Sequence, residues 1–169
     1  LHFHFGTDGS GFDAIIIPDG GSRNQISESS FEVEVIDGKE YNRLQSRMKG
    51  MDVFAFGIST APKSIKKLAE HYGFEYQDCD YFIFHQANLK MNAMIEKKLK
   101  LDHDKVPISM PTFGNTSSAS IPITIVSEFG GKILNGEKFM TCGFGVGLSW
   151  GSLAFTAKNL VVSELVEVE

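Results

Sequence analysis

The sequence has few cysteines and no excess of positive charge, and each shortage excludes a class of protein. Two cysteines among 169 residues, Cys79 and Cys142, are too few and too far apart for a disulfide framework or a zinc knuckle, which favours a reducing compartment. Lysine and arginine number 16 against 21 aspartates and glutamates, so a general nucleic-acid-binding surface has no electrostatic support. We therefore expect no nucleic-acid partner and a cytoplasmic location.

Long hydrophobic runs are also missing. No apolar stretch approaches the roughly 18 to 20 residues that span a bilayer, and Leu1-His2-Phe3-His4 lacks the order of a secretory signal, so no membrane partner is expected. No metal site is predicted either, because the histidines other than His85 have no Cys, Asp or Glu residues at the spacing of metal ligands. The length and the 42% hydrophobic content fit one globular domain. Because the first residue is not Met, we expect a part of a longer polypeptide.

Breaks in the hydrophobic periodicity predict several strands. β-Branched or apolar runs typical of buried strands alternate with turn residues, and Asp37-Gly38 predicts a hairpin. Residues 143–147 are predicted as a tight glycine-rich turn. The predicted strands cover residues 14–17, 31–36, 81–84, 139–142 and 148–157. The tail after Ala157 either extends a strand or frays, and the pattern does not decide between the two.

Helical spacing of apolar residues predicts three helices between these strands. In the first of these segments the local signals disagree. The composition of Val53–Phe56 is typical of a strand, whereas Pro62 is predicted to open a helix that ends at Gly73. Asn88 can cap the second helix, and the third covers residues 119–129. The alternation predicts a layered β/α domain.

Two polar residues are the strongest candidates for chemistry. His85 follows the predicted strand 81–84, and Asn115 lies in a turn before a helix, both places where α/β folds hold ligands. Taken singly, each has a structural explanation: a buried imidazole with one partner, and an ordinary helix cap. Together, a neutral histidine Nε2–H and an asparagine N–H can donate to one carbonyl oxygen and stabilise a forming enolate.

The glycine-rich turn at 143–147 leaves two interpretations open. It does not fit a dinucleotide-binding loop, because a strand and not a helix follows it. Either it is a plain β-turn, or its backbone N–H groups approach a substrate oxygen, which Gly145 and Gly147 would permit. Cys142, within an apolar strand run, is predicted to be a buried structural thiol.

Three motifs occur in order and together resemble one family. The segments His85-Gln86-Ala87-Asn88, Gly114-Asn115-Thr116-Ser117-Ser118-Ala119-Ser120 and Gly143-Phe144-Gly145-Val146-Gly147-Leu148-Ser149-Trp150-Gly151-Ser152 are similar to ketoacyl-acyl carrier protein synthase III, of the thiolase superfamily. Supporting stretches extend the resemblance over nearly the whole chain: residues 7–9, 20–23 and 48–54.

The resemblance implies an α/β, thiolase-like fold. In the family, two similar halves form an αβαβα layered sandwich, and this chain would supply the C-terminal half, with a mixed five-stranded sheet. Residues 1–30 would be the trailing strand and loop of the N-terminal half, and residues 31–169 the C-terminal half. The resemblance also implies helix from about Asp52 onward, in place of the strand that local composition favours.

The resemblance further implies roles for single residues. His85 and Asn115 would bind the thioester carbonyl of malonyl-acyl carrier protein and stabilise the enolate released by decarboxylation. Val146 would lend its backbone N–H to the oxyanion hole of the acyl-enzyme, and Phe144 would lie beside the nucleophilic cysteine as a gate. In the family that cysteine lies in the first half, and neither cysteine of this chain matches its motif. We therefore expect no acyl transfer by this chain alone.

The resemblance implies a set of partners as well. Lys90 and Lys97 are the predicted docking site for the carrier protein or coenzyme A, because an acidic chain that meets an acidic protein needs a local basic site. A second candidate, Lys63, Lys66 and Lys67, is more simply explained as a solvated helix face. Expected partners are acyl carrier protein, acyl-CoA and malonyl thioesters, the missing N-terminal half and a second copy in a homodimer, with no cofactor.

The expected activity is decarboxylative Claisen condensation of an acyl-CoA primer with malonyl-acyl carrier protein in fatty acid biosynthesis. Two alternatives remain open. One is a related condensing enzyme of specialised polyketide or aryl-lipid synthesis. The other is a non-catalytic partner subunit that binds the carrier protein, although a scaffold has no chemical need for His85 and Asn115. The family commonly has a third glycine at Val146 and an arginine at Lys90, so these two departures leave substrate preference and carrier-protein docking undecided.

Overall fold

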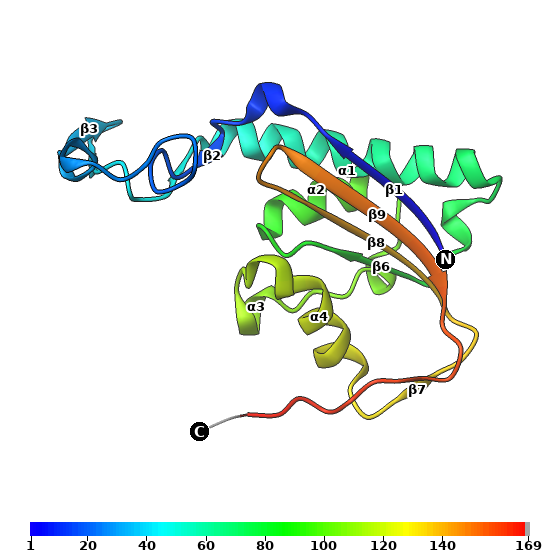
Figure 1. The fold of residues 1–169 in the computed structure, drawn as a ribbon. Coiled ribbons are helices and arrows are strands. Elements are labelled where there is room, and N and C mark those ends of the chain that lie inside the picture. Colours follow the sequence, from blue (N-terminus) through cyan, green and yellow to red (C-terminus); the bar gives the residue numbers. More distant parts are fainter. Residues whose placement is uncertain (168–169) are drawn as a thin grey trace.

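The computed structural model describes residues 1–167 and is built around one mixed sheet (Figure 1). In spatial order its strands are β1 (His2–Thr7), β9 (Ser149–Thr156), β8 (Lys138–Gly145) and β6 (Tyr81–Phe84). β6 runs parallel to β8, and the other neighbours are antiparallel. The mixed character was predicted correctly, but within residues 1–167 the sheet has four strands and not the five expected.

The strand predicted at residues 14–17 does not join this sheet. A 3₁₀ turn, Gly9–Gly11, follows β1 and is capped by Asp8, whose carboxylate accepts the Ser10 N–H at 3.0 Å. The chain turns out of the sheet there, and β2 (Ile15–Ile16) pairs with β5 (Arg47–Met48) instead. The other short strands also pair in twos: β3 (Glu34–Ile36) with β4 (Lys39–Tyr41), and β7 (Ile133–Leu134) with β10 (Leu160–Val161).

Two of these ribbons bear on the predictions. The β3–β4 pair confirms the hairpin at Asp37-Gly38. β10 shows that the tail after Ala157 first forms a short strand, while residues 168–169 lie outside the described part of the chain. β1 pairs with β9. Residues 2–7, which we assigned to the N-terminal half, therefore share a sheet with a strand that we assigned to the C-terminal half. The division of the chain after residue 30 stays a prediction.

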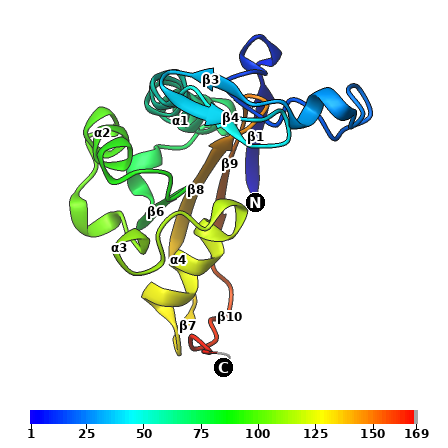
Figure 2. The ribbon, with the colours of Figure 1, turned by 90° about the vertical axis from the view of Figure 1, so that its left-hand side faces the viewer.

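Helices cover both faces of the sheet (Figures 1 and 2). On one face lie α1 (Gly50–Tyr72) and α2 (Leu89–Leu99), and on the other α3 (Met110–Phe113) and α4 (Ser120–Phe129). α1 confirms the helix implied from Asp52 onward, so Pro62 lies inside it and does not open it. It ends at Gly73, as predicted, where a left-handed φ of 69° suits glycine.

Tertiary packing explains why the strand-like start of α1 is helical. Phe54 and Phe56 pack against the core cluster between α1, α2 and the sheet, which also contains the fully buried Ile65 and Leu68. Burying one such aliphatic side chain contributes about 1.5–3 kcal/mol, which outweighs the few tenths of a kcal/mol by which helix propensities of ordinary residues differ.

The run Tyr81–Phe84 is continuously apolar because cores lie on both sides of β6. Phe82 and Phe84 face the α1 and α2 cluster, whereas Ile83 belongs to the second cluster with Phe139, on the α4 side. Phe139 stacks on Phe155 with ring centroids 5.1 Å apart. The strand buried on both faces is thereby confirmed.

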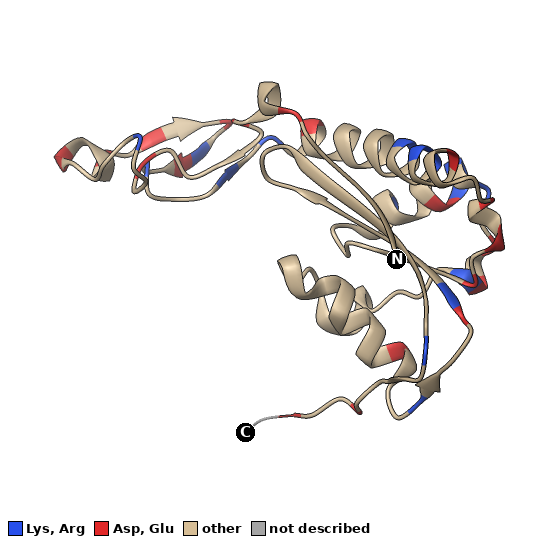
Figure 3. Ribbon diagram, turned by 45° about the vertical axis from the view of Figure 1, so that its right-hand side comes forward, with Lys and Arg blue, Asp and Glu red and all other residues tan. Residues whose placement is uncertain are grey.

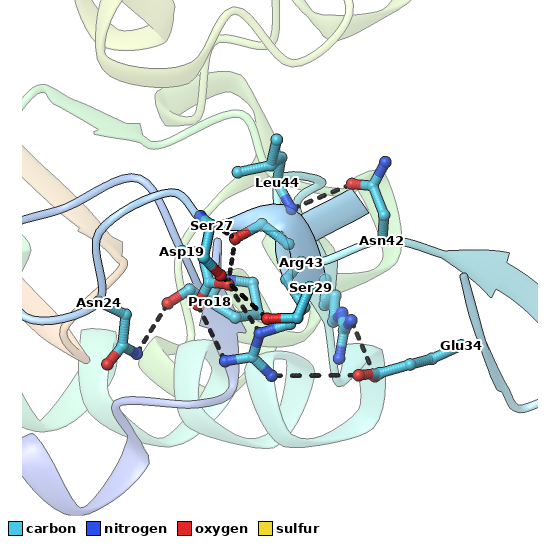
Figure 4. A network of polar contacts seen from close by, with 11 residues as sticks. Pro18, Asp19, Asn24, Ser27, Ser29, Glu34, Asn42, Arg43 and Leu44 are labelled. Carbon is cyan, nitrogen blue, oxygen red and sulfur yellow. Dashed lines mark hydrogen bonds and ion pairs between the residues drawn. The ribbon is translucent and has the colours of Figure 1, made fainter. Parts of the chain in front are cut away.

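Residues 17–48 form a lobe that projects from one end of the sheet (Figure 1), hereafter the projecting lobe. An ion pair closes it: Arg43 Nε lies 2.8 Å and Nη2 2.9 Å from the carboxylate of Asp19 (Figure 4). The Ser30 hydroxyl donates to the same carboxylate at 2.8 Å. The hydrogen bonds from Arg43 lower the pKa of Asp19. This bidentate ion pair joins two segments of the lobe that are 24 residues apart in the sequence.

Charge is distributed unevenly over the helices. Figure 3 shows Lys and Arg gathered along the C-terminal half of α1, which carries Lys63, Lys66 and Lys67, whereas Glu128 is the only charged residue of α4. Within residues 1–167 no helix has the length and apolar character needed to cross a bilayer.

Candidate active site

His85 is placed by the sheet itself. It directly follows β6, and its backbone N–H donates to the Cys142 carbonyl of β8 at 2.9 Å, which continues the strand pairing by one step. The ring is half-buried and meets the Phe144 ring edge-on, with centroids 5.6 Å apart. Its Nδ1 lies 2.7 Å from the Ser120 hydroxyl. These contacts fix the ring at the carboxyl end of the strand, where the sequence predicted it.

The protonation state of His85 follows from this environment. Burial lowers the pKa of His85 from the usual 6.5, and a hydrogen bond with the Ser117 backbone acts in the opposite direction. The net shift is downward, because loss of water contact disfavours the charged ring. The imidazole is therefore neutral near pH 7 and has one N–H to donate.

Asn115 lies in the turn between α3 and α4. Its Oδ1 accepts the backbone N–H of Ser117 at 2.9 Å, a turn that asparagine commonly forms with its own backbone. Because Oδ1 is engaged, Nδ2 is left as the donor of the side chain. Gly114 precedes it with a φ of 66°, a conformation that glycine adopts without strain.

His85 and Asn115 line the same two adjoining cavities, of about 270 Å³ and 550 Å³. Phe144 lines both as well, and Val146 lines the larger one. The structure thus brings together the two predicted catalytic residues, the predicted gate and the predicted oxyanion residue. Ile15 and Met48, which are paired across the β2–β5 ribbon, close the cavities from the side of the projecting lobe.

The glycine-rich turn is shorter than predicted. β8 continues to Gly145, because Gly143, Phe144 and Gly145 pair with Gly151, Trp150 and Ser149 of β9. The turn is therefore confined to residues 146–148. Phe144 is buried within the ladder, whereas the Val146 side chain at the tip is exposed. A glycine-rich segment that composition alone predicts as a turn can thus continue a β-ladder.

Lys90 and Lys97 lie on α2 and are both exposed. Asn88 caps the helix as predicted, since its Oδ1 accepts the backbone N–H groups of Lys90 and Met91. Asn88 and Met91 line the smaller cavity, so Lys90 lies beside its wall. Lys97 is seven residues further, about 10 Å along the helix axis. The docking role of the two lysines stays a prediction.

The two cysteines are buried away from these cavities. Burial raises the pKa of Cys142 to about 12 and that of Cys79 to about 11, so both are thiols at neutral pH. Neither lines the cavities that hold His85 and Asn115. Within residues 1–167 no group of three His, Cys, Asp or Glu side chains is arranged to hold a metal ion.

Several residues of this site had no predicted role. Ser120 and Gln86 occur in the motifs that carry the resemblance, yet their burial beside His85 was not foreseen. A serine in a helix cap and a glutamine after a histidine have no distinctive pattern. The only available signal was that both are polar residues within segments predicted to be packed.

Comparison with known proteins places the site in a family. A family profile described as 3-oxoacyl-[acyl-carrier-protein (ACP)] synthase III C terminal matches residues 69–157. Beta-ketoacyl-[acyl-carrier-protein] synthase III of Clostridioides difficile (strain 630) is 35% identical over 153 residues, which cover 90% of this chain and 44% of the relative. The protein of the same description from Clostridium acetobutylicum is 37% identical over 150 residues, 88% of this chain and 43% of the relative.

Solved structures show the same relationship. A crystal structure of a 3-oxoacyl-(acyl-carrier-protein) synthase III at 31% identity superposes with a TM-score of 0.83 and covers 94% of this chain and 47% of its own. The synthase from Burkholderia xenovorans LB400, 32% identical, gives a TM-score of 0.81 over 96% and 46%. These similarities confirm the predicted thiolase-like α/β fold. This chain spans less than half the length of the relatives it matches, and it belongs to the 3-oxoacyl-acyl carrier protein synthase III family, of which it represents the C-terminal part.

Proposed function

We propose that this chain supplies the C-terminal half of a synthase that condenses an acyl-CoA primer with malonyl-acyl carrier protein in fatty acid biosynthesis. The observation that carries the proposal is the placement of His85 and Asn115 on one pair of cavities, each with an N–H available to donate. Two donors that converge on one carbonyl oxygen stabilise the negative charge that forms there. A neutral His85 donates without itself supplying a charge that must be desolvated.

The donors would act on the malonyl thioester. Cleavage of the bond to the carboxylate releases carbon dioxide and leaves its electron pair in the enolate, whose oxygen accepts hydrogen bonds from His85 and Asn115. The enolate carbon then attacks the acyl group held as a thioester, and the thiolate leaves. The Val146 backbone N–H, at the tip of the turn beside the larger cavity, would stabilise the oxygen of that second carbonyl.

The nucleophilic cysteine would come from the other half of the enzyme. The two thiols of this chain are poor candidates, because both are buried, have raised pKa values and lie away from the cavities. The relatives named above are more than twice as long as the segment they share with this chain. Phe3 and Phe5 of β1 are exposed and stacked with ring centroids 5.5 Å apart, an apolar surface suited to cover by that half.

Lys90 is the residue that we propose first for carrier-protein docking. It lies at the start of α2, beside the cavity wall, and the acyl carrier protein would approach there with its thioester arm directed into the cavity. Lys97 would extend the basic surface away from the mouth. We also propose a homodimer and a cytoplasmic location.

The decisive experiment replaces each donor in the complete synthase. His85→Ala and Asn115→Ala should each reduce malonyl decarboxylation about 10²- to 10³-fold, the usual effect of removing one donor to an oxyanion. His103→Ala is the matched control, because His103 is exposed and lies away from the cavities, and it should leave the rate unchanged. Undiminished decarboxylation in both variants would refute the catalytic role and favour the non-catalytic partner subunit.

A further inference from the structure

A network of buried polar side chains lies directly behind His85. Four residues of the network are almost inaccessible to water, with exposed fractions of 4% or less: Gln86, Ser109, Ser120 and Thr124. They come from the end of β6, the start of α3 and the first turns of α4. Buried polar groups that lack partners are costly, so the hydrogen bonds of such a network are strongly constrained.

The direction of two hydrogen bonds follows from counting protons. The Thr124 hydroxyl donates to the backbone carbonyl of Ser120 at 2.8 Å, which uses its single proton. The Ser109 hydroxyl lies 2.7 Å from Thr124 Oγ1 and must therefore be the donor in that pair. The Gln86 side chain is fixed as well, since its Nε2 donates to the Phe84 carbonyl at 2.8 Å and its Oε1 accepts the Ser109 N–H at 3.3 Å.

The same count applies to Ser120. Its Oγ accepts the backbone N–H of Gln86 at 3.3 Å and lies 2.7 Å from His85 Nδ1. If Nδ1 carried the proton and donated to Oγ, the serine proton would have no acceptor among these contacts in a site that is 1% exposed. Leaving a buried donor unpaired costs about 1–3 kcal/mol. If the serine donates to Nδ1, the serine proton and the ring acceptor are both paired.

We propose that Ser120 is a positioning residue that holds His85 in the tautomer with the proton on Nε2. The 2.7 Å hydrogen bond from the Ser120 hydroxyl to Nδ1 leaves Nε2–H as the only donor of the neutral ring. Gln86 and Thr124 keep the serine in place from two sides. The inference deepens the proposed function, because it explains why a neutral His85 presents a donor to the substrate carbonyl.

The tautomer can be observed independently of activity. In the complete synthase labelled with ¹⁵N-histidine, the ring nitrogens of a neutral histidine give separate signals for the protonated and the unprotonated nitrogen, and His85→Ala identifies those of residue 85. We expect the proton on Nε2 in the wild type above the pKa of the ring. A proton on Nδ1 would mean that the ring donates to Ser120 or to the Ser117 backbone, and it would overturn the proposal even if no variant were made.

The variant Ser120→Ala tests the cause. It should move the His85 signals toward a mixture of tautomers and reduce malonyl decarboxylation about 10- to 100-fold, as expected for loss of a partner that orients a functional histidine. Ser163→Ala is the matched control, because Ser163 is exposed and lines neither cavity, and it should change neither. An unchanged tautomer in folded Ser120→Ala would refute the role of the serine. If His85→Ala left decarboxylation intact, the proposed function would fail while the tautomer assignment would stand.

Discussion

Substituting Gly57 tests how the core of α1 supports the site. A Cβ at this position would lie 2.5 Å from Met91 Sδ and 2.8 Å from Phe144 Cε2, closer than side chains tolerate. At an exposed position within a helix, replacing glycine by alanine stabilises the helix by about 1 kcal/mol. Overpacking a core costs about 1–3 kcal/mol, so Gly57→Ala should destabilise the protein by about 0–2 kcal/mol in spite of its better propensity.

The effect on activity should exceed the effect on stability. The flexible Met91 side chain can move aside, but the Phe144 ring is buried and lies 5.6 Å from the His85 ring, so its displacement disturbs the site. We expect the condensation rate of the complete synthase to fall about 10- to 100-fold, which a shift of the order of 1 Å can cause.

Gly21→Ala is the control for this prediction. A Cβ at Gly21 would meet nothing within 4 Å, and Gly21 lines neither of the two cavities. Thermal unfolding and condensation assays of both variants decide the outcome. A Gly57→Ala enzyme with a raised melting temperature and the full rate would show that the Phe144 contact does not constrain the site.

Three further predictions concern titrating groups. In the folded protein Cys142 should not react with acetyl-CoA or iodoacetamide near pH 8, because its pKa is about 12; a stoichiometric adduct in the intact mass would refute its structural role. Decarboxylation should stay constant as the pH falls to 6.5 and decline only below it, because the lowered pKa of His85 keeps the ring neutral; a decline above pH 6.5 in the pH–rate profile would contradict this. The lowered pKa of Asp19 means that its ion pair stabilises the fold above the ordinary carboxyl pKa of 3.8 and that this stabilisation is lost as the pH falls below that value. Asp19→Asn should therefore flatten the acid branch of the melting-temperature profile, and an unchanged acid branch would exclude the contribution.

Segments with strong local signals were predicted well. The helix end at Gly73 and the cap at Asn88 depend on residues within one turn, so the sequence contains all that determines them. The strand 81–84 was also recognisable, because both of its faces pack against hydrophobic clusters and its sequence is therefore continuously apolar.

Features that depend on distant partners were not predictable in the same way. Whether Ile15–Ile16 joins the main sheet is decided by the 3₁₀ turn before it and by Arg47–Met48, some thirty residues later. The length of β8 is likewise set by its pairing with β9, which carries the ladder through three residues that composition assigns to a turn. Pairing across such separations has no signal in local hydrophobic periodicity.

The candidate site combines both kinds of information. His85 and Asn115 were found because polar residues at strand ends and turns are conspicuous, but their convergence required α4 to pack against β6. The parallel pairing of β6 with β8 places His85 beside Phe144, and the hydrogen bond from the first residue of α4 to Nδ1 fixes the ring from the other side. The geometry at His85 is thus set mainly by sheet register and by buried hydrogen bonds. For this reason a conservative change behind the ring, Ser120→Ala, should alter the tautomer of His85 although the substituted side chain is only 1% exposed.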